Sequence, residues 1–209
     1  MNEAMPASDL VLFLLVLLGY LLGSIPFGYL LVRGKSGRDI RGIGSGNIGA
    51  TNVLRTTSRS LGILTLLLDI GKGFLAVWIA ARFTAGSPLW TSAAALAVMA
   101  GHAFPVFLKF HGGKAVASFV GAFLYLTPLP LAVTLALFVI VVAATRFISL
   151  GSILGAAALP FLAWLIDRPP APIVAAAAIG GAFIILRHKE NIARLRAGKE
   201  NALSLGARP

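Results

Sequence analysis

The longest uncharged stretches of this sequence constrain its fold more than any other feature. Residues 10–32 are 23 consecutive residues without a charged side chain, enough for a helix to cross the ~30 Å hydrocarbon core of a bilayer. Only 12% of the residues in the chain are charged, whereas a soluble domain carries about 25%. A surface with so little charge faces lipid, and the sequence therefore predicts an all-α integral membrane protein.

The apolar runs predict seven transmembrane helices within a single domain, residues 1–209. Their expected bounds are about 10–32, 61–81, 89–108, 115–127, 130–145, 150–166 and 171–186. The stretch 115–145 is ambiguous, because its 31 residues lie between the lengths of one crossing and two. We expect two short helices of about 15 residues each, separated by an outer turn at the TPLP segment, residues 127–130.

The distribution of lysine and arginine supports this count. With seven helices, 15 of the 18 Lys and Arg residues fall in segments on one side of the membrane and 2 on the other. Positive residues gather on the cytoplasmic side, so the N-terminus is expected outside and the C-terminus in the cytoplasm. A single crossing at 115–145 would instead place the basic C-terminal tail outside.

Composition excludes several classes of site. The chain has no cysteine, which excludes disulfides, zinc–thiolate sites and cysteine nucleophiles. A net charge of +11 is typical of nucleic-acid binding, but in a membrane protein it indicates basic cytoplasmic loops attracted to anionic lipid. We expect no nucleic-acid partner. The three histidines have no clustered acids beside them in the sequence, so no metal and no cofactor are expected.

The first polar loop, residues 41–55, reads RGIGSGNIGATNVLR. Glycines allow backbone N–H groups to approach phosphate oxygens, and the guanidinium of an arginine matches phosphate geometry. The candidate phosphate-binding residues in this loop are Ser45, Asn47, Gly49, Thr51 and Arg55. Arg41 is either a second clamp or a marker of the cytoplasmic side. The G-x-G-x-x-G pattern at 44–49 is not read as a dinucleotide fingerprint, because no strand precedes it.

The second polar segment, residues 101–114, reads GHAFPVFLKFHGGK. Gly112, Gly113 and Lys114 open the next helix and predict a phosphate hook at its N-terminus. A lone histidine in a helix is usually structural, but an ionisable group within the membrane often marks function, which makes His102 a candidate. Within the helix expected at 61–81, Asp69 and Lys72 are three residues apart and predict a structural ion pair.

Two further segments carry candidates. Ser152 lies one turn into the helix expected at 150–166. The segment RHKEN, residues 187–191, contains His188 and Asn191, which share a face if the helix continues through them. The alternative is that this segment is only a basic cytoplasmic anchor.

Taken in this order, GSGNIGATNVLR, GHAFPVFLKFHGGK and RHKEN closely resemble the motifs of the bacterial acyl-phosphate:glycerol-3-phosphate acyltransferases (PlsY). The resemblance covers essentially the whole chain, including GSIPFG at 23–28. It implies transfer of a fatty acyl group from acyl phosphate to the sn-1 hydroxyl of glycerol 3-phosphate. The expected product is 1-acyl-glycerol 3-phosphate (lysophosphatidic acid), made for phospholipid synthesis at the bacterial inner membrane by a site that faces the cytoplasm.

The same resemblance assigns roles to residues of this chain. It implies phosphate-binding roles for Ser45, Asn47, Gly49, Thr51, Arg55, Gly112, Gly113 and Lys114. It implies catalytic roles for His102, Ser152, His188 and Asn191. One departure is visible, because the family usually reads GGKGVAT where this chain has Ala115 in place of the third glycine.

Two questions stay open at the level of sequence. The group that accepts the proton from the sn-1 hydroxyl is His102, His188 or the phosphate of the donor itself, and we favour the phosphate. The alternative function is a small membrane transporter for an organic phosphate, since glycine-interrupted helices and internal charges also occur in transporters. The absence of an internal repeat and the expected gathering of polar motifs on one side favour the enzyme.

Overall fold

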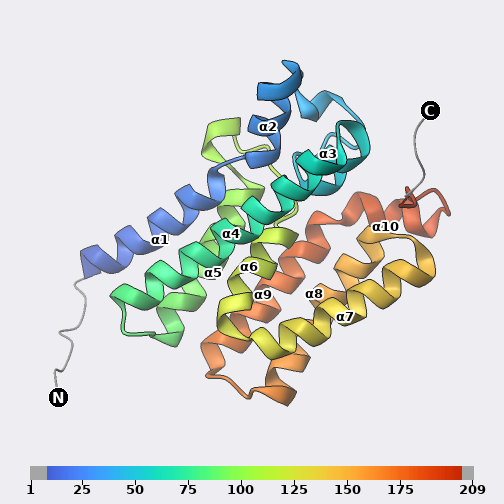
Figure 1. Ribbon diagram of the computed structural model, residues 1–209. Helices are drawn as coiled ribbons and strands as arrows, with labels where there is room; N and C mark the ends of the chain where they lie inside the picture. The colour runs from blue at the N-terminus through green and yellow to red at the C-terminus, as the bar shows by residue number, and fades with distance from the viewer. Residues whose placement is uncertain (1–8, 204–209) are drawn as a thin grey trace. The chain divides into compact units, whose positions relative to one another are not determined.

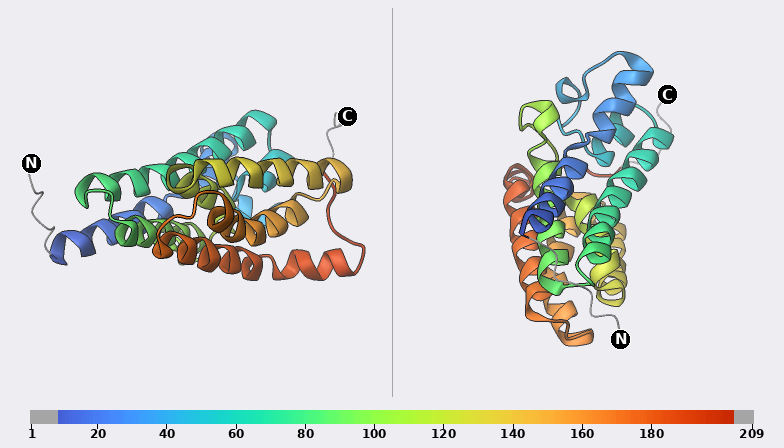
Figure 2. Two further views of the ribbon diagram at one scale, coloured as in Figure 1. Left: turned by 90° about the horizontal axis from the view of Figure 1, so that it is seen from below. Right: turned by 90° about the vertical axis from the view of Figure 1, so that its left-hand side faces the viewer.

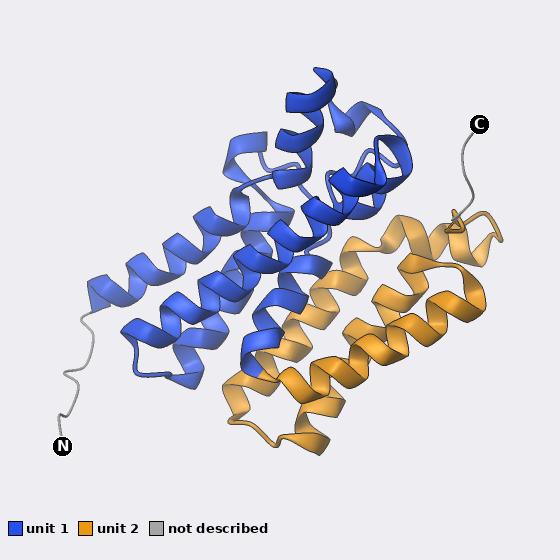
Figure 3. Cartoon of the chain, viewed as in Figure 1, with its two compact units in different colours: residues 1–126 blue, residues 127–209 orange. Residues whose placement is uncertain are grey.

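The structure is a computed structural model that describes residues 9–203, and every element assigned within them is helical. These residues belong to two compact units, residues 1–126 and residues 127–209 (Figure 3). Many large apolar side chains point outward; Leu10, Phe161 and Leu186, for example, are 65%, 73% and 71% exposed. Such an apolar surface suits lipid rather than water.

Unit 1 is arranged around one central helix (Figure 1). Helix α4 contacts α1, α2, α3, α5 and α6. The elements of unit 1 are α1 (Asp9–Ser24), α2 (Phe27–Ser36), η1 (Ile40–Gly42), α3 (Ala50–Thr56), α4 (Arg59–Phe83), α5 (Pro88–Ala103), η2 (Val106–Leu108) and α6 (Val116–Leu126).

Unit 2 is a helical hairpin extended by a third helix and a bent end. Helix α8 packs against both α7 and α9, and α10 follows α9. The elements of unit 2 are α7 (Pro128–Thr145), α8 (Ile148–Ile166), α9 (Ala171–Arg187) and α10 (Lys189–Arg196). The axes of α9 and α10 differ by 59°.

Length and hydropathy identify five helical segments that can cross a membrane, or six if α9 and α10 form one broken span. The protein is therefore a multi-pass integral membrane protein with an all-helical fold. Helices α4, α8 and α9 begin and end within two residues of the predicted bounds. The first predicted helix is instead broken between α1 and α2, because Pro26 has no backbone N–H to continue the helical hydrogen bonds.

The prediction of two short helices around Pro128 is correct for one of them. Helix α6 has only 11 residues, but α7 has 18 and begins at Pro128 itself. Proline is favoured in the first turn of a helix, where an N–H is not needed. The predicted TPLP turn is thus reduced to Thr127, and the remaining residues of that segment belong to α7.

Glycines bring the helices of unit 1 into direct backbone contact. A methyl group on Gly121 of α6 would overlap the backbone of Ile70 in α4, and one on Gly73 of α4 would overlap that of Ser118 in α6. Gly23 of α1 lies against α5 in the same way. Small residues at such contacts let helices approach closely in lipid, so polar side chains of α4, α5 and α6 come within reach of one another.

Candidate functional site

The first polar loop is held together by Asn52, a side chain that is 2% exposed. Its Oδ1 accepts the backbone N–H of Ser45 at 2.9 Å. Its Nδ2 donates to the carbonyl oxygens of Ile43 and Asn47, both at 2.9 Å. A buried amide that satisfies several backbone groups fixes the course of the irregular residues between η1 and α3.

Two glycines give this loop its tight curvature. Gly44 and Gly46 have φ angles of +62° and +70°, a region in which residues with a side chain are strained. Between them Ser45 is exposed at the turn. Asn47 Oδ1 accepts the backbone N–H of Gly49 at 2.8 Å, directly before α3. That oxygen therefore shapes the turn, which is a role the sequence did not predict for Asn47.

Thr51 and Arg55, both half-buried, lie on α3, a short helix inside the predicted loop. Arg41 is engaged elsewhere: its Nη2 lies 2.6 Å from Asp39 Oδ2, and its Nε donates to both carboxylate oxygens. Hydrogen bonds from Arg41 lower the pKa of Asp39 from 3.8 to about 2. Because Asp39 occupies the Nε and Nη2 donors of the Arg41 guanidinium, the structure favours a structural role for Arg41 over a second phosphate clamp.

The second polar segment folds back onto the end of α5. The backbone N–H of Gly113 donates to the carbonyl oxygen of His102 at 3.0 Å. A methyl group on Gly113 would overlap His102 Nε2, and one on Gly112 would overlap the His102 carbonyl and the Pro105 ring. Only glycine fits at either position. The loop that leads to Lys114 therefore lies directly against His102, which is 4% exposed.

Ala115 occupies a position that suits glycine, with φ at +61° and its methyl group fully buried. The left-handed conformation costs alanine about 1–2 kcal/mol. Glycine would remove that cost but would lose about 0.8 kcal/mol of methyl burial and about 0.4–1 kcal/mol through its more flexible unfolded chain. The opposing contributions nearly cancel.

We therefore expect Ala115→Gly to change the free energy of unfolding by less than about 1 kcal/mol, as measured by thermal unfolding in detergent. Ala85 is a matched control, because it has φ at +49° but is exposed. Ala85→Gly should be stabilising, since no methyl burial is lost. A loss beyond about 2 kcal/mol in Ala115→Gly would show that the Ala115 methyl is a packing requirement.

The two polar segments lie at the same end of unit 1. In Figure 1 and in the right-hand view of Figure 2, α2, α3 and the connection through η2 gather there. Helix α2 lies directly against the first loop, since a methyl group on Gly28 of α2 would overlap the carbonyl of Ile48. This end of unit 1 thus brings together two glycine-rich turns, in which the backbone N–H groups of Ser45, Gly49 and Gly113 donate the hydrogen bonds that hold the turns.

Unit 2 carries the remaining predicted residues, all buried. Ser152 Oγ donates to the carbonyl oxygen of Ile148 at 2.9 Å, which leaves its lone pairs to accept a hydrogen bond. His188 lies at the joint between α9 and α10, and its Nδ1 is 2.8 Å from the carbonyl oxygen of Ile184. That contact places the proton of a neutral imidazole on Nδ1.

Asn191 lies in the first turn of α10, and its Nδ2 donates to Glu200 Oε1 at 2.8 Å. The other oxygen of Glu200 accepts from Arg194 Nε at 2.9 Å. The Glu200 side chain is 2% exposed. The condition set for His188 and Asn191 to share a face, that the helix continue through them, is not met, because α9 ends at Arg187 and α10 begins at Lys189 with a bend of 59° between them.

Two residues and one contact that hold the candidates in place were missed by sequence reasoning: Asn52, Glu200 and the contact of Asp69 with His102. Asn52 lies within the motif GSGNIGATNVLR. Its side-chain amide could therefore have been identified from the sequence as a group that holds the loop. The partner of Glu200 is nine residues away, in a tail without periodicity, and no pattern points to it.

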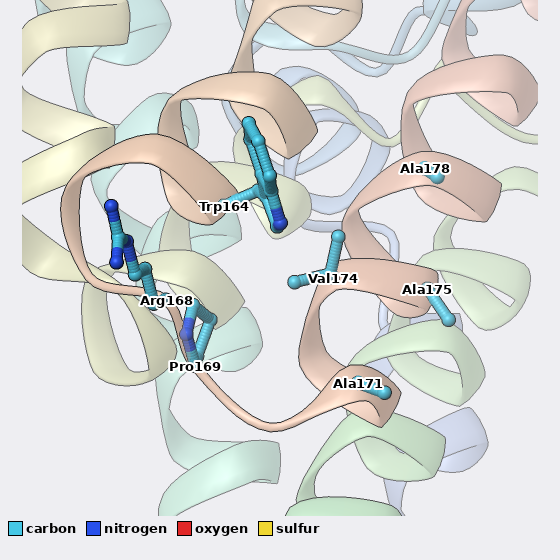
Figure 4. Close-up of a pocket in the computed structure, with 7 residues that line it drawn as sticks. All are labelled: Trp164, Arg168, Pro169, Ala171, Val174, Ala175 and Ala178. Carbon is cyan, nitrogen blue, oxygen red and sulfur yellow. The ribbon is translucent and has the colours of Figure 1, made fainter.

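A hollow at the other end of α9 contains none of the candidate residues (Figure 4). Its lining residues are Trp164, Arg168, Pro169, Ala171, Val174, Ala175 and Ala178. Among residues 9–203, no three His, Asp or Glu side chains gather as metal ligands would.

An all-helical membrane protein with glycine-rich, basic turns at one end of unit 1 is a candidate for a phosphate-handling membrane enzyme. A family model described as glycerol-3-phosphate acyltransferase matches residues 13–198. The chain belongs to this family.

Curated relatives and solved structures agree with this assignment. Glycerol-3-phosphate acyltransferases of Geobacter sulfurreducens and Geotalea daltonii are 48% and 46% identical, over 90% of this chain and 95% of each relative. Two crystal structures of PlsY (YgiH), an integral membrane glycerol 3-phosphate acyltransferase, match with TM-scores of 0.87 and 0.84. They are the glycerol 3-phosphate and lysophosphatidic acid forms, 36% and 34% identical, covering 93% of this chain and 96% of theirs.

Proposed function

We propose that the protein transfers a fatty acyl group from acyl phosphate to the sn-1 hydroxyl of glycerol 3-phosphate, producing 1-acyl-glycerol 3-phosphate and inorganic phosphate. The observation that carries this proposal is the pair of glycine-rich turns at one end of unit 1, in a chain that belongs to the glycerol-3-phosphate acyltransferase family. Both substrates carry a phosphate, and the donor also carries an apolar chain suited to a lipid-facing surface.

In this reaction the sn-1 oxygen attacks the carbonyl carbon of the acyl phosphate. The bond between that carbon and the phosphate oxygen breaks, and phosphate leaves. Because phosphate is a good leaving group, the protein has to position the two substrates and to stabilise negative charge. We assign the proton of the hydroxyl to the departing phosphate.

Phosphate binding falls to the candidates of unit 1. Arg55 and Lys114 supply positive charge, the hydroxyl groups of Ser45 and Thr51 supply donors, and Gly49, Gly112 and Gly113 let a phosphate approach the backbone of the turns. Asn47 supports the first turn through its contact with Gly49. In unit 2, Ser152, His188 and Asn191 are proposed to orient the glycerol or the leaving phosphate.

The topology that accompanies this proposal has seven crossings, an outer N-terminus and a cytoplasmic C-terminus, in the bacterial inner membrane. The short apolar helix α6 supplies the crossing beyond the six counted by length. Because the chain has no cysteine, Arg38→Cys and Arg168→Cys can be labelled separately in intact cells with a membrane-impermeant maleimide. The proposal expects labelling at 168 and none at 38, and the reverse result would overturn the orientation.

Purified protein tests the proposed activity. In detergent, palmitoyl phosphate and labelled glycerol 3-phosphate should yield labelled 1-acyl-glycerol 3-phosphate. In liposomes without a donor, the protein should not release entrapped glycerol 3-phosphate. Release without acyl transfer would replace the enzyme by the alternative, a transporter for an organic phosphate.

A further inference from the structure

A buried chain of polar side chains crosses the centre of unit 1, from α4 through α5 to α6. Asp69 Oδ1 lies 2.8 Å from Lys72 Nζ on α4 and 3.6 Å from His102 Nδ1 on α5. Ser118 Oγ of α6 lies 3.3 Å from the same nitrogen of His102. All four residues are at most 5% exposed. Ionisable groups in such a setting are costly unless they are paired.

Lys72 has a structural partner besides Asp69. Its Nζ donates at 2.9 Å to the carbonyl oxygen of Ile25, which lies in the break between α1 and α2. The lysine therefore ties α4 to the break at Pro26, and Asp69 balances its charge. Balancing that charge would not by itself require Asp69 to lie beside an imidazole.

The far side of the His102 ring supports the second polar segment. Its Nε2 lies where a side chain on Gly113 would begin, and its carbonyl oxygen accepts the Gly113 N–H. The imidazole is thus enclosed between Asp69 and Ser118 on one side and Gly113 on the other. A shift of the ring would displace the turn that precedes Lys114.

We propose that Asp69 is a positioning residue for phosphate binding: by fixing the Nδ1 side of His102, it holds the ring that supports the turn of Gly112, Gly113 and Lys114. This inference rests on the proposed function, because that turn is taken to bind the phosphate of glycerol 3-phosphate. His102 then acts through the turn and need not accept a proton, which agrees with proton transfer to the departing phosphate.

The double variant Asp69→Asn/Lys72→Met separates positioning from charge balance. Asp69→Asn alone leaves a buried ammonium without its counter-charge and should lower the Tm, whereas removing both charges should restore most of it. If Asp69 also positions His102, the double variant keeps a raised KM for glycerol 3-phosphate, by about tenfold or more, with kcat within about threefold of wild type. A purely structural pair would leave KM unchanged.

A second variant keeps the test decisive if the double variant fails to fold. Asp69→Glu retains the negative charge for Lys72 but moves the carboxylate by one methylene, so it should raise KM with little change in Tm. Ser92→Ala, a buried hydroxyl of α5 ten residues before His102, is the matched control and should leave KM unchanged. Unchanged KM in whichever of the two Asp69 variants folds would overturn the inference.

Wild-type protein in the same assay distinguishes a failure of the proposed function from a failure of the positioning role of Asp69. If wild type transfers no acyl group from acyl phosphate, the proposed function itself is wrong. If wild type is active and the Asp69 variants bind glycerol 3-phosphate normally, only the positioning role is wrong.

Discussion

Replacing Arg55 by alanine is expected to lower kcat/KM for acyl transfer by about 10²- to 10⁴-fold. A guanidinium that grips a phosphate makes two charge-assisted hydrogen bonds, each worth about 1.5–3 kcal/mol. Lysine cannot reproduce the planar pair of donors, so Arg55→Lys should recover only part of the activity. The measurement is initial-rate kinetics with acyl phosphate and glycerol 3-phosphate in detergent.

The protein should remain folded after this change. Arg55 is half-buried in the last turn of a seven-residue helix, α3, and truncation there removes little packing. Arg38, an exposed arginine of the same basic segment, is the matched control, and Arg38→Ala should retain nearly full activity. A near-normal rate in Arg55→Ala would remove Arg55 from phosphate binding and weaken the assignment of the first loop.

The second large effect is expected for Gly113→Ala. The added methyl group would overlap Nε2 of His102, and the ring cannot retreat because Asp69 and Ser118 lie against its other side. The turn has to move instead. A displacement of about 1 Å in a binding site can cost about 10²-fold in rate, so kcat/KM should fall by at least that factor.

Gly34→Ala is the control for this prediction. Gly34 lies on α2 with open space where its side chain would be, so the variant should be fully active and no less stable. Direct binding of glycerol 3-phosphate, measured by calorimetry, should weaken in Gly113→Ala alone. Normal binding and turnover in that variant would show that the turn tolerates movement and does not hold the substrate.

The sequence predicted the spans and the polar segments because both are encoded locally. The length of an apolar run indicates whether it can cross a bilayer, and glycines beside basic residues can be recognised within one short segment of sequence. The contacts between helices are different. Asp69 and His102 are 33 residues apart in the sequence, and α4 and α5 are apolar on most of their surface. Such helices do not reveal which face meets a neighbour.

Local structure inside the polar loops was also beyond the sequence. Helix α3 has seven residues, too few for a periodic pattern to establish it. The left-handed conformation of Ala115 goes against its residue type. Tertiary packing imposes it, since the methyl group is fully buried. At such positions the preference of the residue is overridden by its surroundings.

The shortness of α6 has a consequence for how a water-soluble head group and a fatty chain can react together. Eleven residues of helix reach about 16 Å, roughly half of the ~30 Å apolar layer. In the proposed seven-crossing topology, the turn of Gly112, Gly113 and Lys114, which precedes this helix, fills part of the depth that a full-length helix would occupy. At the depth of this turn, glycerol 3-phosphate can reach the carbonyl group of the acyl phosphate. The hydrocarbon chain of the acyl phosphate can meanwhile remain in the apolar layer of the bilayer.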